Sequence, residues 1–431
     1  MTLRGNVIQG VLGFLGPAVI VLASYPALLR HLGAAAFGVY LLAISMSGSV
    51  VFLDFGLAAA AVKFVAEDLA SGRTKAAADV IVTSLVVFGA TGLIAGGAIA
   101  ASAPLLAVLF KVESQLAGDA ILAFRLAGLH FLILLPSLIF VSVAKAVEQF
   151  DRAAIFMCLL SLATYGAGAI AVLAGAGLTG AMAATVAANL IAVGLVSFEG
   201  VRLCHARGIE LREGRAVAYR RLLRFGWSLT VNSMAGFLMV QLQRYVVAAA
   251  MGPAAVSVYQ AAAAVPARIH LAVNAATEVM FPFSSVSRDR AFLRRIYLRM
   301  LGGSALVGVG GSVALILLAR PLLTLWLGAP FAASVLPLVP VFALAYLFLT
   351  LSPAPFHLVN GIGRPGLNTV FCLMNAMINI LLIAIFAWNG LTLMKMAWAF
   401  AAANIVTNVG YQVTVETLIW RRAPRALEVP A

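Results

Sequence analysis

Charged residues are scarce in this sequence. Asp, Glu, Lys and Arg together make up 10% of its 431 residues, whereas hydrophobic residues make up 63%. A soluble domain usually carries about 25% charged residues, because a polar surface must cover its core. The apolar residues also fall in long runs, such as 37–62 and 392–415. Runs longer than about 18 residues are typical of membrane-spanning helices, so the composition excludes an ordinary soluble enzyme.

Motifs that would indicate chemistry are also missing. The three cysteines, Cys158, Cys204 and Cys372, lie far apart and form neither a metal-binding nor a redox motif. The sequence contains no Gly-x-x-x-x-Gly-Lys-Ser/Thr loop for ATP phosphates and no His-Glu-x-x-His zinc motif. We therefore expect no catalytic residue, no metal and no cofactor. The first apolar run lacks a small-x-small cleavage site, so we expect no cleaved signal peptide.

What is present is a series of apolar runs that predicts an all-α polytopic membrane protein with about twelve transmembrane helices. The predicted spans are 8–29, 37–62, 79–101, 121–143, 154–174, 178–201, 226–250, 254–281, 297–319, 334–358, 368–388 and 392–419. An even number of spans places both termini on the same side of the membrane.

The basic residues predict which side that is. The net charge is +14, but most of the 29 Lys and Arg residues lie in short connections rather than on one face, which argues against a nucleic-acid partner. With the termini inside, the outside connections hold only four basic residues, Arg30, Lys111, Arg320 and Lys395. Basic connections stay in the cytoplasm and contact anionic lipids. We therefore expect a bacterial inner-membrane protein with both termini cytoplasmic.

The sequence also falls into two similar halves. The hydrophilic stretch 202–224 separates an N-terminal six-helix lobe, 1–201, from a C-terminal six-helix lobe, 225–431. Gly33 precedes Tyr40 by seven residues, and Gly252 precedes Tyr259 by the same spacing. Later, 147–152 matches 359–364. Such a repeat predicts an axis along the membrane normal, a substrate site near the midplane and alternating access.

Several short motifs resemble those of a known family. They are Leu29-Arg-His-Leu-Gly-Ala-Ala-Ala-Phe-Gly-Val-Tyr-Leu-Leu42, Leu53-Asp-Phe-Gly-Leu57, Lys63-Phe-Val-Ala-Glu67, Gly252-Pro-Ala-Ala-Val-Ser-Val-Tyr259 and Asn360-Gly-Ile-Gly-Arg364. In these motifs and in overall layout the chain resembles Wzx-type polysaccharide flippases, which share a superfamily with the MATE drug exporters and the lipid II flippases.

This resemblance implies two six-helix lobes that form a V around a central cavity, lined mainly by the first, second, seventh and eighth helices. It implies transport of undecaprenyl-diphosphate-linked oligosaccharide units to the periplasmic leaflet, for O-antigen, lipopolysaccharide or exopolysaccharide synthesis. Many relatives carry an acidic residue late in the seventh span, where this chain reads Gln241-Leu-Gln-Arg244. Ion coupling, by a proton or a sodium ion, therefore cannot be assigned by analogy.

Intramembrane ionisable residues are the candidate site residues, because they are costly to insert. Arg244 and Arg268 lie in the seventh and eighth spans, and a guanidinium suits phosphate oxygens. For Arg244 the alternative is snorkelling to the interface, and for Arg268 it is an ion pair with Glu278. Asp54, in the second span, could bind a coupling ion or could equally form a structural pair.

Polar residues at helical spacing add to this candidate cavity. His270, Asn274 and Glu278 recur every four residues along the eighth span, and Asn232 lies on a polar face of the seventh. The predicted set is thus Arg268, Arg244, Asn232, Asn274 and His270 for the diphosphate or sugar, with Asp54 and Glu278 for coupling or an ion pair.

Two other functions fit the composition. A cation-coupled exporter of small amphipathic molecules would have an acid-lined cavity, which Arg268 disfavours. A membrane polysaccharide polymerase or ligase would need a long polar outside loop, and the longest outside connection, near 102–120, is short.

Overall fold

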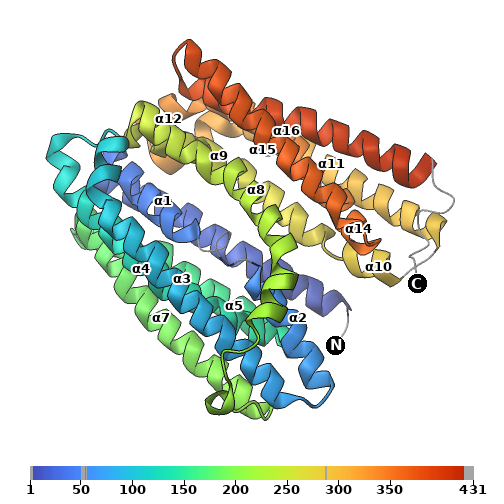
Figure 1. Cartoon of the computed structure of the whole chain (residues 1–431). Coiled ribbons are helices and arrows are strands. Elements are labelled where there is room, and N and C mark those ends of the chain that lie inside the picture. Colours follow the sequence, from blue (N-terminus) through green and yellow to red (C-terminus); the bar gives the residue numbers. More distant parts are fainter. Residues whose placement is uncertain (1–2, 50–53, 55, 287–288, 422–431) are drawn as a thin grey trace. The chain divides into compact units, whose positions relative to one another are not determined.

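The structure is a computed structural model that describes residues 3–49, 54, 56–286 and 289–421. These residues form helices joined by short turns, and none of them lies in a strand (Figure 1). Eight of the described helical segments are by themselves long and apolar enough to cross a membrane. The protein is therefore an all-α polytopic membrane protein, as predicted.

The first two predicted spans are arranged differently from the sequence prediction. Helix α1, Leu3–Gly48, covers the first predicted span and the beginning of the second, 37–62. It bends at Gly33, whose φ and ψ are 77° and 167°. Helix α2, Leu57–Ala70, begins after a turn at Asp54 and Gly56. The prediction of a continuous helix over 37–62 was wrong, because Gly56 takes the left-handed conformation that ends a helix.

The remaining helices follow the predicted order. In the first part of the chain they are α3 Thr74–Leu109, α4 Ser114–Ala146, α5 Phe150–Ser161, the π-helix Leu162–Gly166, α6 Ala167–Leu173, α7 Leu178–Ala206, the 3-10 turn Leu211–Glu213 and α8 Tyr219–Met251. They continue as α9 Pro253–Thr277, α10 Met280–Val286, α11 Arg290–Leu327, α12 Ala329–Val335, the 3-10 turn Leu336–Leu338, α13 Val339–Thr350, α14 Pro353–Gly361, α15 Pro365–Trp388, α16 Leu393–Val415 and the π-helix Glu416–Arg421.

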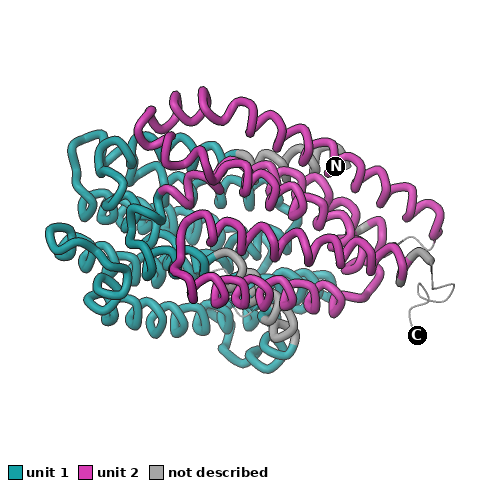
Figure 2. The backbone as a smooth tube through the Cα atoms, turned by 90° about the horizontal axis from the view of Figure 1, so that it is seen from above, with its two compact units in different colours: residues 1–257 teal, residues 258–431 magenta. Residues whose placement is uncertain are grey.

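The chain divides into two compact units, Met1–Ser257 and Val258–Ala431 (Figure 2). Helix α8 thus groups with the first unit, and α9 begins in the first and continues in the second. This division falls later than the predicted lobe boundary at 202–224. The six-plus-six division therefore stays a prediction.

Small residues allow α3 and α4 to pack closely within the first unit. A Cβ atom at Gly96 would lie 2.4 Å from the carbonyl oxygen of Gly128, and one at Gly128 would lie 2.3 Å from the carbonyl oxygen of Gly96. Both separations are shorter than any van der Waals contact, so the two backbones touch directly. Close backbone approach is what holds membrane helices together where lipid offers no hydrophobic driving force.

Polar side chains join helices inside the apolar core of each unit. In the first, the Tyr40 hydroxyl donates to the Thr164 carbonyl at 3.1 Å and lies 2.9 Å from the Thr185 hydroxyl. In the second, the Gln412 amide donates to the Leu351 carbonyl at 2.8 Å. Such interhelical hydrogen bonds satisfy polar groups that lipid could not.

Backbone conformation supports the internal repeat. Four residues with positive φ in the first half have counterparts at matching steps of the second, whereas Gly56, Gly72 and Gly208 have none among the described residues. The pairs are Gly33 and Gly252, Lys111 and Gly328, Glu148 and Gly363, and Gly175 and Gly390. Gly252, with φ 82° and ψ 173°, has nearly the same conformation as Gly33. The two halves therefore bend and turn at corresponding places.

One match made from the sequence needs a shift in register. The Gln149 N–H donates to the Ala144 carbonyl at 2.8 Å, and the Arg364 N–H donates to the Val359 carbonyl at 3.0 Å. Both bonds close a Schellman turn around a positive-φ residue. Gln149 therefore corresponds to Arg364, and the predicted pairing of 152 with 364 was wrong by three residues.

Candidate functional site

Helix α9 carries most of the predicted site residues of the second unit. Arg268, His270 and Asn274 lie within the helix and are partly buried. Glu278 lies just beyond the helix, in an exposed turn, where its N–H donates to the Asn274 carbonyl at 3.1 Å. The predicted polar stripe is therefore helical from His270 to Asn274 and ends in a turn at Glu278.

Arg268 has hydrogen-bonding capacity that the protein leaves unused. Its Nε atom is buried and has no hydrogen-bond partner. Within the described part of the chain it forms no ion pair, so the alternative pairing with Glu278 is not formed. A buried donor without a partner costs about 1–3 kcal/mol, which a bound acceptor would recover. Arg268 is thus suited to bind an anionic oxygen.

Two histidines, one on α9 and one on α14, also have a buried ring nitrogen without a hydrogen-bond partner. Nδ1 of His270 and Nε2 of His357 are buried without partners. The His270 ring lies 6.3 Å from the Tyr346 ring. His357 belongs to α14 and was not predicted, because one histidine in an apolar run gives no signal of its long-range neighbours.

Helix α8 carries the predicted residues of the first unit. Arg244 is partly buried and has no ion-pair partner among the residues described. The adjacent Tyr245 hydroxyl lies 3.3 Å from the Ser45 hydroxyl, and the Gln241 amide donates to the Ser45 carbonyl at 3.2 Å. These bonds fix the end of α8 that carries Arg244 against α1. The Asn232 side chain lies outside the described residues.

Asp54 is used locally. Its Oδ1 accepts from the Gly56 N–H at 2.8 Å, and its carbonyl accepts from the Leu57 N–H at 2.9 Å. Asp54 does not continue the helical face of Ser47, because α1 ends at Gly48. Ser47 instead contacts the carbonyls of Ala43 and Ala127. In this conformation Asp54 caps the turn that precedes α2.

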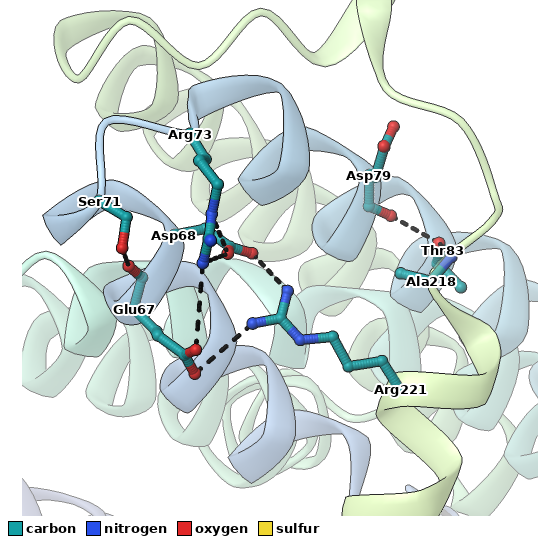
Figure 3. Close-up of polar contacts among 8 residues, drawn as sticks. All are labelled: Glu67, Asp68, Ser71, Arg73, Asp79, Thr83, Ala218 and Arg221. Carbon is teal, nitrogen blue, oxygen red and sulfur yellow. Dashed lines mark hydrogen bonds and ion pairs between the residues drawn. The ribbon is translucent and has the colours of Figure 1, made fainter.

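A network of charges joins α2, the turn between α2 and α3, and α8, and was not predicted (Figure 3). The side chain of Asp68 is fully buried, and its two oxygens accept from Arg73 and Arg221, each at 2.8 Å. Glu67 lies 3.5 Å from Arg221 and 4.0 Å from Arg73. No sequence pattern marks this network, because Asp68 and Arg221 are 153 residues apart.

The segment before α8 is anchored to α3 beside this network. The Arg215 N–H donates to Asp79 Oδ1 at 2.7 Å. The Ala218 N–H donates to the Thr83 hydroxyl at 3.1 Å (Figure 3). These side chains satisfy backbone donors just before the helix begins. The first turn of α8 is therefore held in place next to α2.

The start of α8 also borders an open cavity of about 510 Å³. Phe64, Arg220, Arg221 and Arg224 line it. No group of His, Cys, Asp and Glu suited to hold a metal ion occurs among the described residues. Among the described residues, the α9 stripe with His357 and the arginines of α8 are two places with polar groups that the protein leaves free to bind a ligand.

Comparison with known proteins shows the family of this chain. A family model described as "Polysaccharide biosynthesis protein" matches residues 27–336. The match covers more than half of the chain. The chain belongs to the polysaccharide biosynthesis protein family.

A curated relative and two solved structures resemble this chain over most of its length. A Shigella flexneri protein named "Putative O-antigen transporter" is 24% identical over 392 residues, which are 86% of this chain and 87% of that protein. An inward-facing multidrug resistance MATE family transporter of the MOP superfamily matches with a TM-score of 0.74 at 15% identity, over 96% of both chains. A Vibrio cholerae MATE transporter matches with a TM-score of 0.67 at 12% identity, over 98% of this chain and 97% of that one. The chain thus has the fold of these transporters.

Proposed function

We propose that this protein is a flippase. It moves undecaprenyl-diphosphate-linked oligosaccharide units from the cytoplasmic to the periplasmic leaflet by alternating access. Its family and its O-antigen transporter relative support a transporter in polysaccharide synthesis rather than a polymerase or ligase. The substrate class is the new part of the proposal.

The observation that carries the substrate class is the buried Nε of Arg268, which has no hydrogen-bond partner. Its Nε is buried in a helix of a membrane protein, where an unpaired donor is costly. A guanidinium presents a planar fork of donors that matches phosphate oxygens and stays charged at any working pH. A diphosphate is the part of the proposed substrate that would need such a partner. His270 and Asn274, on the same helix, would contact the sugar.

The proposal also covers the membrane in which the protein lies and the ion that drives transport. We place the protein in the inner membrane with cytoplasmic termini and expect a proton or a sodium ion to drive transport. Glu278 is the better of the two predicted coupling residues. Its side chain is exposed at the end of α9 and acts electrostatically on His357, whereas the carboxylate of Asp54 caps a turn. Arg244 remains a second candidate for the diphosphate.

Deletion and complementation in the source bacterium test the flippase. The deletion strain should lose surface glycan and accumulate lipid-linked oligosaccharide on the cytoplasmic leaflet, and the wild-type gene should restore both. Arg268→Gln should lower translocation about tenfold or more, the loss expected for one charge-assisted hydrogen bond. Arg268→Lys should be intermediate, because an ammonium keeps the charge but not the fork.

Arg320→Gln is the matched control, because Arg320 is exposed on α11. It should support normal glycan at a normal protein level in the membrane. Normal glycan in the deletion strain, with no accumulation, would contradict the flippase and favour a cation-coupled exporter. Wild-type glycan with Arg268→Gln would remove Arg268 from substrate binding while leaving the flippase intact.

A further inference from the structure

The cavity at the start of α8 is lined by more arginines than there are acidic side chains to pair with them. Of its three arginines, Arg221 is paired with the buried Asp68 and with Glu67. Arg73 is the second cation on these two carboxylates. Two acidic and two basic groups therefore balance each other inside the network.

Arg220 and Arg224 remain as uncompensated charges. Both are exposed, and neither has an acidic partner in the described part of the chain. They are four residues apart in α8, so they lie one turn apart on the same side of the helix. Both line the same cavity. Two adjacent positive charges facing one open space suit a ligand that carries more than one negative oxygen.

The aromatic wall of the cavity is also ordered. The guanidinium carbon of Arg221 lies 4.0 Å from the centre of the Phe64 ring, which is a stacked cation–π contact. Asp68 accepts a hydrogen bond from the edge of this guanidinium and holds it in position. The cavity is thus lined by the held pair Arg221 and Phe64 and by two arginines that have no acidic partner among the described residues. Its volume, about 510 Å³, is in the range of small-ligand sites.

We propose that Phe64, Arg220, Arg221 and Arg224 form a binding site for the phosphate or diphosphate headgroup of a membrane lipid. The site lies in the first turns of a long helix of a membrane protein, next to the most basic connection of the chain. Arginines at such a boundary bind lipid phosphates. These residues belong to the first unit and Arg268 to the second, and the inference does not depend on the flippase proposal.

Binding to the purified protein tests the site. Full-length protein in phosphatidylcholine nanodiscs is titrated with farnesyl diphosphate, with inorganic pyrophosphate and with increasing phosphatidylglycerol, and adducts are measured by native mass spectrometry. We expect at least one of the two lipids to bind. Arg220→Gln with Arg224→Gln should weaken that binding about 10- to 30-fold, and each single variant should weaken it less.

The matched control is Arg295→Gln with Arg299→Gln. These arginines are also exposed and four residues apart near the start of a long helix, α11, but they do not line this cavity. The control should bind like wild type. Equal weakening in both double variants would show general attraction to basic helix ends and would overturn the site.

The three probes separate the sources of the phosphate. Tighter binding of farnesyl diphosphate than of phosphatidylglycerol would identify a lipid diphosphate as the occupant, and the reverse would identify an anionic phospholipid. Binding of pyrophosphate alone would overturn a lipid site, as would the absence of binding by all three. Wild-type affinity in the Arg220 and Arg224 double variant would also overturn it.

Discussion

At the scale of single residues, Asp68 shows how a buried charge can be kept in a membrane protein. Its side chain is fully buried, yet it meets two guanidiniums that are themselves 54% and 34% exposed. The charges are thus neutralised in the interior while the cations keep contact with water. Burying a carboxylate is tolerated only when such partners are present.

Asp68→Asn should destabilise the protein by about 2 kcal/mol. The value lies below the 3–5 kcal/mol typical of breaking a fully buried pair, because both arginines reach solvent and Arg221 can turn to Glu67. Glu67→Gln is the control. Glu67 is 51% exposed, so its loss should cost about 0–1 kcal/mol. Thermal unfolding of the detergent-solubilised variants measures both, and equal shifts would contradict a structural role specific to Asp68.

At the scale of elements, hydropathy predicted the helices well but not their interruptions. The run 37–62 is apolar throughout except for Asp54, so nothing in its hydropathy marks the end of α1 at Gly48. The break becomes visible only through the Asp54 turn and the positive φ of Gly56. Local hydrogen bonds, which apolar periodicity does not record, decide where a span is broken.

Two glycines of α4 should respond oppositely to substitution by alanine: one change should lower the free energy of unfolding and the other should raise it. Gly128→Ala places a Cβ against the Gly96 backbone and should cost about 1–3 kcal/mol, because the helices must move apart. Gly118→Ala, exposed and with open space around its Cβ, should stabilise α4 by about 0.5–1 kcal/mol. Unfolding midpoints of the two variants test this, and shifts of the same sign would show that α3 and α4 do not approach each other this closely.

At the scale of the whole molecule, the sequence predicted the fold class, the order of the helices and the family. Long apolar runs report directly on membrane insertion, so these features needed no tertiary information. The site was harder to predict. Arg268 and His270 were proposed as site residues from a mid-span charge and from a polar stripe at helical spacing, whereas His357 and Asp68 were missed. Their roles depend on neighbours such as Asn274 and Arg221 that only folding brings close.

The predicted orientation follows from the distribution of basic residues over all connections. A green fluorescent protein fused after Ala431 should fluoresce, because this reporter folds in the cytoplasm. Basic connections are retained in the cytoplasm, and with an even number of spans both ends of the chain then lie there. Alkaline phosphatase and green fluorescent protein fusions at this position measure the two outcomes. Phosphatase activity there would contradict the twelve-span topology, and a fusion after Ser114, expected outside, serves as the control.

Corresponding turns of the two halves are made by different kinds of residue. Lys111 and Glu148 hold positive φ angles that glycine occupies at the corresponding Gly328 and Gly363. A non-glycine residue in that conformation costs about 1–2 kcal/mol, so the first half tolerates strain that the second avoids. The same turn is thus made by a residue with a side chain in one half and by glycine in the other. Lys111→Gly and Glu148→Gly would relieve in the first half a strain that the second half does not carry.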